Sequence, residues 1–249
     1  MDTDTILLII AEWIGVVAVG MLVGLSPQLR KIRPLQFLFP RREASVTLSV
    51  NAVMFVFSIL LYGRFFTAAG IPGTLQPEAL LQRIILDVLG LAAIGAALYT
   101  RKQPLRSALW GKDALRPNLQ FGLLLAALII FLRGKVFAIT NGIETAEGVA
   151  LLQLLIISAC EVTIFFGYSQ PRLTARFGEN TGWLISALLY TLWQVIPLAL
   201  PGVGGQAALF QVGLAIGQGV ILGWITRKSR HILAPVLYLT LSQWLFLIK

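Results

Sequence analysis

Cysteine, histidine and charged residues are all scarce in this sequence. Among 249 residues there is one cysteine and one histidine, and only 12% are charged. A single cysteine excludes an internal disulfide and a Cys-rich metal site, and a single histidine excludes a site that needs two His ligands from one chain. A soluble domain has about a quarter of its residues charged. Half that fraction cannot cover a globule of this size, so a soluble enzyme, a disordered protein and a disulfide scaffold are poor interpretations.

Apolar residues make up 57% of the chain and fall into eight stretches, most of them near the length that crosses a bilayer. The stretches are Ile6–Leu25, Val46–Ala69, Ile84–Thr100, Leu119–Phe137, Val149–Tyr168, Trp183–Leu200, Ala207–Thr226 and Ile232–Ile248. No strand alternation of the outer-membrane-barrel kind is present, so we predict an all-α polytopic helix bundle. In the fourth stretch we expect Arg133 and Lys135 to extend to a membrane interface.

The net charge of +9 follows the links between these stretches. The links after the first, third, fifth and seventh stretches hold 15 of the 20 basic residues and three acids, Glu43, Asp113 and Glu179. The positive-inside rule predicts that these links are cytoplasmic and that both termini lie outside, in a bacterial inner membrane or an organellar equivalent. The basic surplus is thereby explained by topology, and we expect the lipid bilayer as a partner and no nucleic acid.

The ends and links of the chain point to one integral membrane domain over residues 1–249. The acidic N-terminus lacks the basic region and small-residue cleavage site of a signal peptide, so the first stretch is expected to remain as a helix. Small residues predict close helix contacts. They are Gly213, Gly217, Gly219 and Gly223 in the seventh stretch, Gly20 and Gly24 in the first, and the Gly and Ala residues of the third, which we expect to be buried. Pro197 and Pro235 are expected to interrupt their helices.

Three acids lie within apolar stretches, where a carboxylate is costly and is a functional candidate. Asp87 follows Arg83 by four residues, which predicts an ion pair on one helix face, with a structural role. Glu12 lies about two turns inside the outer face. Glu161 has no basic residue in helical register, so any partner must come from another helix, and the carboxyl is either neutral or paired there with a polar group.

Amides on two other helices lie at matching depths. We expect a polar cluster of Glu161, Gln194 and Gln243 in the bundle interior, with Tyr190 on the face of Gln194. Gln211 and Gln218 are candidates to join this cluster. Interhelical hydrogen bonding explains such residues as well as a ligand site does, and residue types alone favour the former.

The C-terminal motifs resemble a known family. They are EVTIFFGYSQPRL at 161–173, Phe177-Gly178, SALLYTLWQ at 186–194, the Gly-rich stretch 213–224 and APVLYLTLSQ at 234–243. In order and spacing they resemble the motifs of the CPBP family, which comprises CAAX prenyl endopeptidases and bacteriocin-processing intramembrane proteases, also called Abi proteins. The resemblance covers about residues 150–249 and implies a CAAX-protease-like helix bundle.

The same comparison shows replaced chemistry. In the family the leading Glu of the first motif activates a water, and His residues with an Asn or Asp complete the site. Glu161 matches that Glu. The family's second Glu, its Arg, its two His and its Asn or Asp are replaced here, in that order, by Val162, Phe166, Gln194, Leu239 and Gln243.

Neither of the two other reactive residues makes up for these losses. His231, beside Arg230, is expected to be an interfacial loop histidine, and Cys160 is expected to pack in the apolar interior. A general base needs a positioned reaction partner, and a glutamine amide does not transfer a proton. We therefore identify no catalytic residue among the degenerate motif positions, and we expect no metal and no cofactor.

These residues favour a non-catalytic family member that acts by binding, as an accessory, assembly or scaffolding subunit for another integral membrane protein. Two alternatives remain open at this point. One is an intramembrane endopeptidase with a reduced site on Glu161 and Gln194. The other is a small transporter or a lipid- or pigment-binding protein in which Glu12, Asp87 and Glu161 line a polar path.

Overall fold

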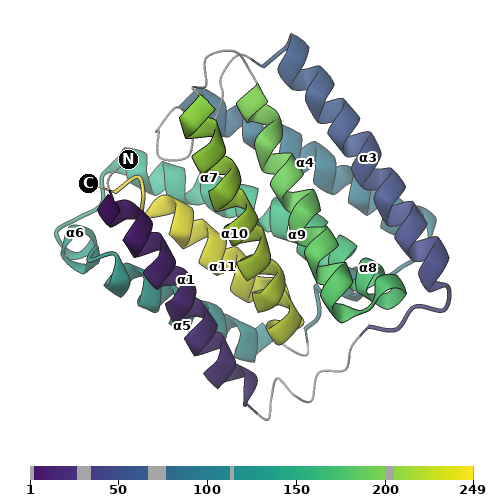
Figure 1. The fold of residues 1–249 in the computed structure, drawn as a ribbon, viewed down its shortest axis with the longest axis horizontal. Coiled ribbons are helices and arrows are strands. Elements are labelled where there is room, and N and C mark those ends of the chain that lie inside the picture. The colour runs from purple at the N-terminus through teal and green to yellow at the C-terminus, as the bar shows by residue number, and fades with distance from the viewer. Residues whose placement is uncertain (1–2, 27–34, 67–76, 113–114, 200–204, 249) are drawn as a thin grey trace.

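A computed structural model describes residues 3–26, 35–66, 77–112, 115–199 and 205–248, and these fold into helices without a strand (Figure 1). The elements are α1 (Thr3–Gly24), α3 (Pro40–Arg64), α4 (Pro77–Thr100), η1 (Leu105–Ala108), α5 (Leu115–Leu132), α6 (Val136–Thr140), α7 (Thr145–Glu161), η2 (Val162–Ser169), α8 (Gln170–Phe177), α9 (Glu179–Val195), η3 (Ile196–Ala199), α10 (Gly205–Ser229) and α11 (Leu233–Trp244). The prediction of an all-α polytopic bundle is confirmed. Arg30, Lys31, Arg33, Asp113, residues 67–69 and residue 200 lie outside the described ranges.

Within the described ranges, seven helices are long and apolar enough to cross a membrane. They are Ile6–Gly24, Pro40–Arg64, Glu78–Thr100, Leu115–Leu132, Thr145–Phe177, Glu179–Leu198 and Ala208–Ser229. The eighth predicted stretch forms α11, a helix of 12 residues and hence about 18 Å. α11 packs against α5 and α7, and most of its residues are buried. Surrounded by protein, it needs less length than a lipid-facing helix does.

The start of α1 and the end of α11 are found at the same end of the bundle (Figure 1). We call this end the terminal side, and the opposite end, where α3 begins and α4 ends, the basic side. Lys135 Nζ, which we expected to reach a membrane interface, donates 2.8 Å to the Ile248 carbonyl near the C-terminus. One large apolar core fills most of the interior between the two sides.

Glycines allow close helix approach at most of the predicted positions. A Cβ at Gly217 would collide with the Trp13 ring, one at Gly20 with the Trp224 ring, and one at Gly223 would lie 2.5 Å from Trp183 Cδ1. Gly213 has no neighbour within 4 Å, so its predicted contact is wrong.

The third predicted stretch is less buried than expected. On α4, Gly90 contacts Met54, but Gly95 has nothing within 4 Å, and Ala92 and Ala96 are exposed. The expectation that all small residues of this helix are buried is therefore wrong, because part of its small-residue face points outward.

Neither predicted proline interrupts a long helix. Pro197 lies in η3, where α9 has already ended, and Pro235 lies in the first turn of α11. The backbone N–H groups of a first turn have no intrahelical acceptor, so a proline there removes no helical hydrogen bond. Pro197 thus follows the end of a helix and Pro235 lies at the start of one, and neither interrupts a helix as expected.

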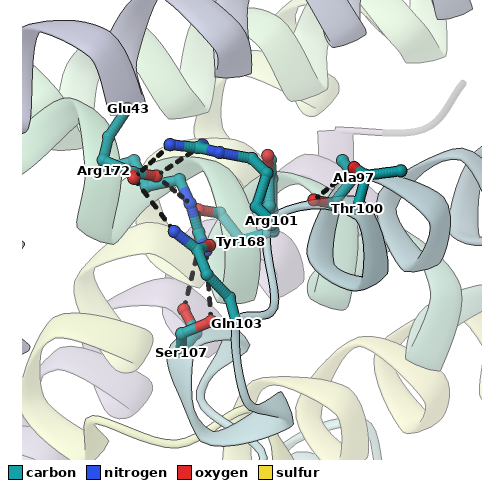
Figure 2. Close-up of polar contacts among 8 residues, drawn as sticks. All are labelled: Glu43, Ala97, Thr100, Arg101, Gln103, Ser107, Tyr168 and Arg172. Carbon is teal, nitrogen blue, oxygen red and sulfur yellow. Dashed lines mark hydrogen bonds and ion pairs between the residues drawn. The ribbon is translucent and has the colours of Figure 1, made fainter.

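A buried polar network ties α3, α8 and the loop after α4 together at the basic side (Figure 2). Arg172 is fully buried and donates from Nε to Glu43 (3.2 Å) and from Nη1 to the Ser107 carbonyl (3.0 Å). Glu43 also accepts from Arg101 Nη1 (2.8 Å) and from Gln103 Nε2 (2.9 Å). Glu43, Arg101 and Arg172 belong to the charged links of the chain, and here they fasten the loop between α4 and α5 to the bundle.

Candidate functional site

Glu161, the retained motif carboxylate, ends α7 and is 1% exposed. Its Oε1 accepts from Arg83 Nε (3.0 Å) and from Arg83 Nη2 (2.5 Å), and its Oε2 accepts from Gln194 Nε2 (2.8 Å). Arg83 Nη2 also donates to Gln194 Oε1 (2.8 Å). The Glu161 partner that had to come from another helix is therefore Arg83 on α4, and Gln194 on α9 closes a three-membered hydrogen-bond ring.

Asp87 also forms an ion pair with Arg83, a member of this ring. Arg83 Nε lies 3.2 Å from Asp87 Oδ2, and Trp193 Nε1 donates to Asp87 Oδ1 at 2.8 Å. Asp87 is fully buried, and the Arg83 side chain is 13% exposed. One guanidinium thus serves two carboxylates on different helices, an arrangement that compensates part of the cost of burying all three charges.

The remaining predicted cluster residues lie around a cavity of about 140 Å³ in the terminal half of the bundle. Gln194, Gln211, Gln218 and Gln243 all line it, together with Arg83 and Glu161. Tyr190 does not line it; the Tyr190 hydroxyl donates to Gln218 Oε1 at 3.3 Å. The structure therefore brings Glu161 and Gln194 into direct contact and places Gln243 on the wall of the same cavity.

A second buried ion pair lines the same cavity from the first half of the chain. Arg133 Nε donates to Glu12 Oε2 at 2.8 Å, and Ser242 Oγ donates to Glu12 Oε1 at 2.7 Å. The guanidinium of Arg133 stacks 3.9 Å over the Phe246 ring. The expectation that Arg133 reaches a membrane interface is wrong, because a buried carboxylate on α1 holds it inside the bundle.

The segment that follows Glu161 has unusual backbone geometry. Residues Val162–Ser169 form a π-helix of eight residues, all of them buried, between α7 and α8. Ser169 Oγ donates to the Ile164 carbonyl, five residues earlier, at 2.8 Å. π-Helical turns are rare and are frequent at functional sites. Here the turn follows directly on the one retained motif carboxylate.

The other motif positions offer little chemistry. Leu239, at the place of the family's second His, is fully buried, as is Phe166 at the place of the motif Arg. Cys160 is buried beside Glu161 in the apolar interior. Among the residues placed by the structure, no group of three or more His, Cys, Asp or Glu residues could hold a metal ion.

His231 is a loop histidine, as expected, but its side chain is not exposed. It is 2% exposed and sits between α10 and α11. Its Nδ1 accepts from the Leu233 backbone N–H at 3.0 Å, and its Nε2 lies 2.9 Å from the Gly111 carbonyl. Burial lowers the pKa of His231. Its contacts fix the start of α11.

Sequence reasoning missed three links: Arg83 to Glu161, Arg133 to Glu12, and Trp193 to Asp87. The positions of the charged residues in the sequence could have predicted the first two of these links. Each buried acid needs a compensating partner, and Arg83 and Arg133 are basic residues that border or interrupt apolar stretches at similar depth. Nothing in the spacing pointed to Trp193.

Comparison with known protein families finds a match in the C-terminal part of the chain. Residues 144–245 match the family model described as type II CAAX prenyl endopeptidase Rce1-like. No curated protein and no solved structure matches the chain. The matched region holds Glu161, Gln194 and Gln243, whereas Arg83 and Arg133 lie outside it. The match covers less than half of the chain. Together with seven membrane-length helices among the described residues, it supports an integral membrane protein that is similar to the CPBP family over residues 144–245.

Proposed function

We propose that the chain is a non-catalytic CPBP homologue that acts as an accessory, assembly or scaffolding subunit of another integral membrane protein. One observation carries the proposal: both oxygens of Glu161 are engaged by Arg83 and Gln194. A carboxylate that activates water needs an oxygen within hydrogen-bond reach of that water, and a second group must act on the substrate. Here Glu161, Arg83 and Gln194 are instead hydrogen-bonded to one another.

The neighbouring groups add no substitute for the missing chemistry. Gln194 donates to Glu161 and accepts from Arg83, so its amide is already occupied on both sides. Leu239 has no polar atom in its side chain. Stabilisation of an oxyanion requires donors aimed at the reacting carbonyl. The Arg83 donors for which the structure gives hydrogen bonds, Nε and Nη2, point at carboxylates and an amide of the protein itself.

The outer face of α4 supports a role in binding a membrane partner. Ala92, Gly95 and Ala96 are exposed there, and small residues at this spacing let a second helix approach closely. Gly95 has no atom within 4 Å of the place where a Cβ would stand. A face that is small, apolar and unfilled suits another transmembrane helix.

Co-purification tests this proposal. The full chain is isolated from its native membrane in a gentle detergent, and proteins that remain bound are identified. Gly95→Leu is expected to reduce recovery of the partner at least tenfold. Gly63→Leu is the matched control, since Gly63 is also exposed and also has nothing within 4 Å. A chain that runs alone as a monomer, or equal loss with both variants, contradicts the proposal.

A protease assay tests the same proposal from the other side. Purified protein is incubated with prenylated and transmembrane peptides, and cleavage is followed by mass spectrometry. We expect no cut with the wild type. A cut that is lost in Glu161→Gln would establish an intramembrane endopeptidase with a reduced site.

The cavity favours a second candidate function, the binding of a small molecule or lipid. Glu12 and Glu161 line it with both arginines, although Asp87, expected on the same path, lies behind Arg83. Mass spectrometry of the protein extracted under mild conditions would reveal a retained compound. Its loss in Gln243→Leu, with the fold retained, would assign the compound to this cavity.

A further inference from the structure

The loop from Arg101 to Lys112, between α4 and α5, has one fixed side and one exposed side. Ser107 and Ala108 in η1 are buried, and a Cβ at Gly167 of η2 would lie 2.7 Å from the Ala108 carbonyl oxygen. Gln103 Nε2 donates to Glu43, and Ser107 accepts from Arg172 at both its carbonyl and its hydroxyl. Figure 2 shows this loop held against α3 and α8 by the network.

The backbone of this loop is strained at two positions. Lys102 has φ 52° and Leu109 has φ 61°, the left-handed region that side chains with a Cβ rarely adopt. They are two of the three non-glycine residues with positive φ in the described part of the chain. Such strain persists only where surrounding contacts impose it, and it gathers at ligand clamps. The network around Glu43 and Arg172 supplies those contacts.

The exposed side combines cations with large apolar side chains. Lys102, Arg106 and Lys112 are exposed, and Leu105 (67%) and Trp110 (48%) lie between them. Neither Lys102 nor Arg106 forms an ion pair with any residue that the structure places. Among the described residues near this loop, the carboxylate of Glu43 is already paired with Arg101 and Arg172.

We propose that this loop is a binding site for the headgroup of an anionic phospholipid. Lys102 and Arg106 bind the phosphate, while Leu105 and Trp110 enter the boundary between headgroups and acyl chains. Trp is the residue that sits at this depth of a bilayer, and basic side chains near the surface attract anionic lipids.

The position of the loop favours a lipid over an acidic protein. α4 ends at Thr100 and α5 begins at Leu115, and both are membrane-length helices. The loop between them is therefore held at the membrane surface. An exposed leucine and tryptophan alternating with cations match a layer that is polar on one side and apolar on the other.

Native mass spectrometry of the full chain in maltoside micelles tests this site. Phosphatidylglycerol or phosphatidylcholine is added, and the apparent Kd of the first bound lipid is measured. We expect phosphatidylglycerol to bind at least tenfold more tightly. Arg106→Gln should weaken its binding about fivefold, the contribution of one basic side chain at a membrane surface. Trp110→Ala should weaken binding of both lipids.

Arg64→Gln is the matched control, because Arg64 is an exposed arginine at the opposite end of α3. It should leave the affinity for phosphatidylglycerol unchanged, and thermal unfolding of each variant checks that the fold is intact. Equal affinity for the two lipids, or equal loss with Arg64→Gln and Arg106→Gln, would overturn the proposal. Competition by glycerol phosphate at the same concentration as the lipid, or stronger binding of an acidic peptide, would also overturn it.

Discussion

Trp13 of α1 lies directly on Gly217 of α10, and seven residues further along each helix the relation is reversed, with Trp224 of α10 lying on Gly20 of α1. Each of the two helices thus packs one tryptophan ring against a glycine of the other helix. Trp13 and Gln218, the residue after Gly217, also line the cavity that holds Glu161 and Gln194, so this contact makes α1 one of its walls.

Gly217→Leu is expected to lower the free energy of unfolding by at least about 1–3 kcal/mol, the usual cost of forcing extra carbons into a packed site. The Trp13 ring occupies the space that a leucine side chain at 217 would need, so either the ring or the helix must move. Thermal unfolding in detergent measures the effect. Gly213→Leu, four residues earlier on an open face, is the control and should change the midpoint little. Equal destabilisation by both would show that the helix, not the contact, is sensitive.

Arg83→Met is expected to destabilise the protein by about 3–5 kcal/mol, because Glu161 and Asp87 would be left buried without their shared cation. The triple variant Arg83→Met, Asp87→Asn, Glu161→Gln should recover most of that loss. It removes all three charges, while the asparagine amide that replaces the Asp87 carboxylate keeps an acceptor for Trp193. Chemical unfolding of the single and triple variants makes the comparison. A triple variant as unstable as Arg83→Met would mean that packing of the Arg83 stem, rather than charge, dominates.

The helices and the polar site differ in how far the sequence predicts them. Hydropathy places each spanning helix because the bilayer imposes a length and an apolar surface on every segment alone. The partner of Glu161 is 78 residues away, on a helix whose rotation about its own axis is set by its neighbours. Periodicity predicts the Arg83–Asp87 pair, four residues apart on one helix, but carries no information on which helix faces Glu161.

The π-helix after Glu161 illustrates the same limit. Residues Val162–Tyr168 form a largely apolar run with one polar residue, Thr163, and such a run fits an α-helix and a π-helix equally well. Its wider turn is packed against α4, α9 and α10, and these contacts are tertiary. The family motif locates the segment, while its backbone geometry follows only from the packed structure.

The Glu12–Arg133 pair should show a much larger coupling energy than the exposed Glu179–Arg227 pair. The side chains of the first pair are 1% and 7% exposed, and those of the second are 61% and 34% exposed. A double-mutant cycle with Glu12→Gln and Arg133→Gln should give about 1–3 kcal/mol, against about 0.2–1 kcal/mol for the surface pair. Similar values for the two cycles would contradict the idea that this pair fixes α1 to α5.

His231 should make the protein less stable as pH falls below neutrality. Burial lowers its folded-state pKa below the ordinary value of 6.5, so the neutral ring is favoured in the folded state. The unfolded chain then binds a proton first, and the stability contributed by His231 is complete above pH 6.5 and is lost as pH falls through the lowered folded pKa. In the neutral ring, Nδ1 accepts a hydrogen bond from the Leu233 N–H. Protonation places a hydrogen on this nitrogen, which can then no longer accept.

His231→Asn separates this effect from every other pH-dependent contribution to stability. An asparagine oxygen takes the place of Nδ1 as acceptor for the Leu233 N–H and does not titrate. Unfolding midpoints measured from about pH 7.5 to about pH 5 should fall more steeply for the wild type than for His231→Asn, and the difference between the two curves isolates the histidine. Parallel curves would show that His231 stays in one protonation state over this range. The start of α11 would then be independent of pH.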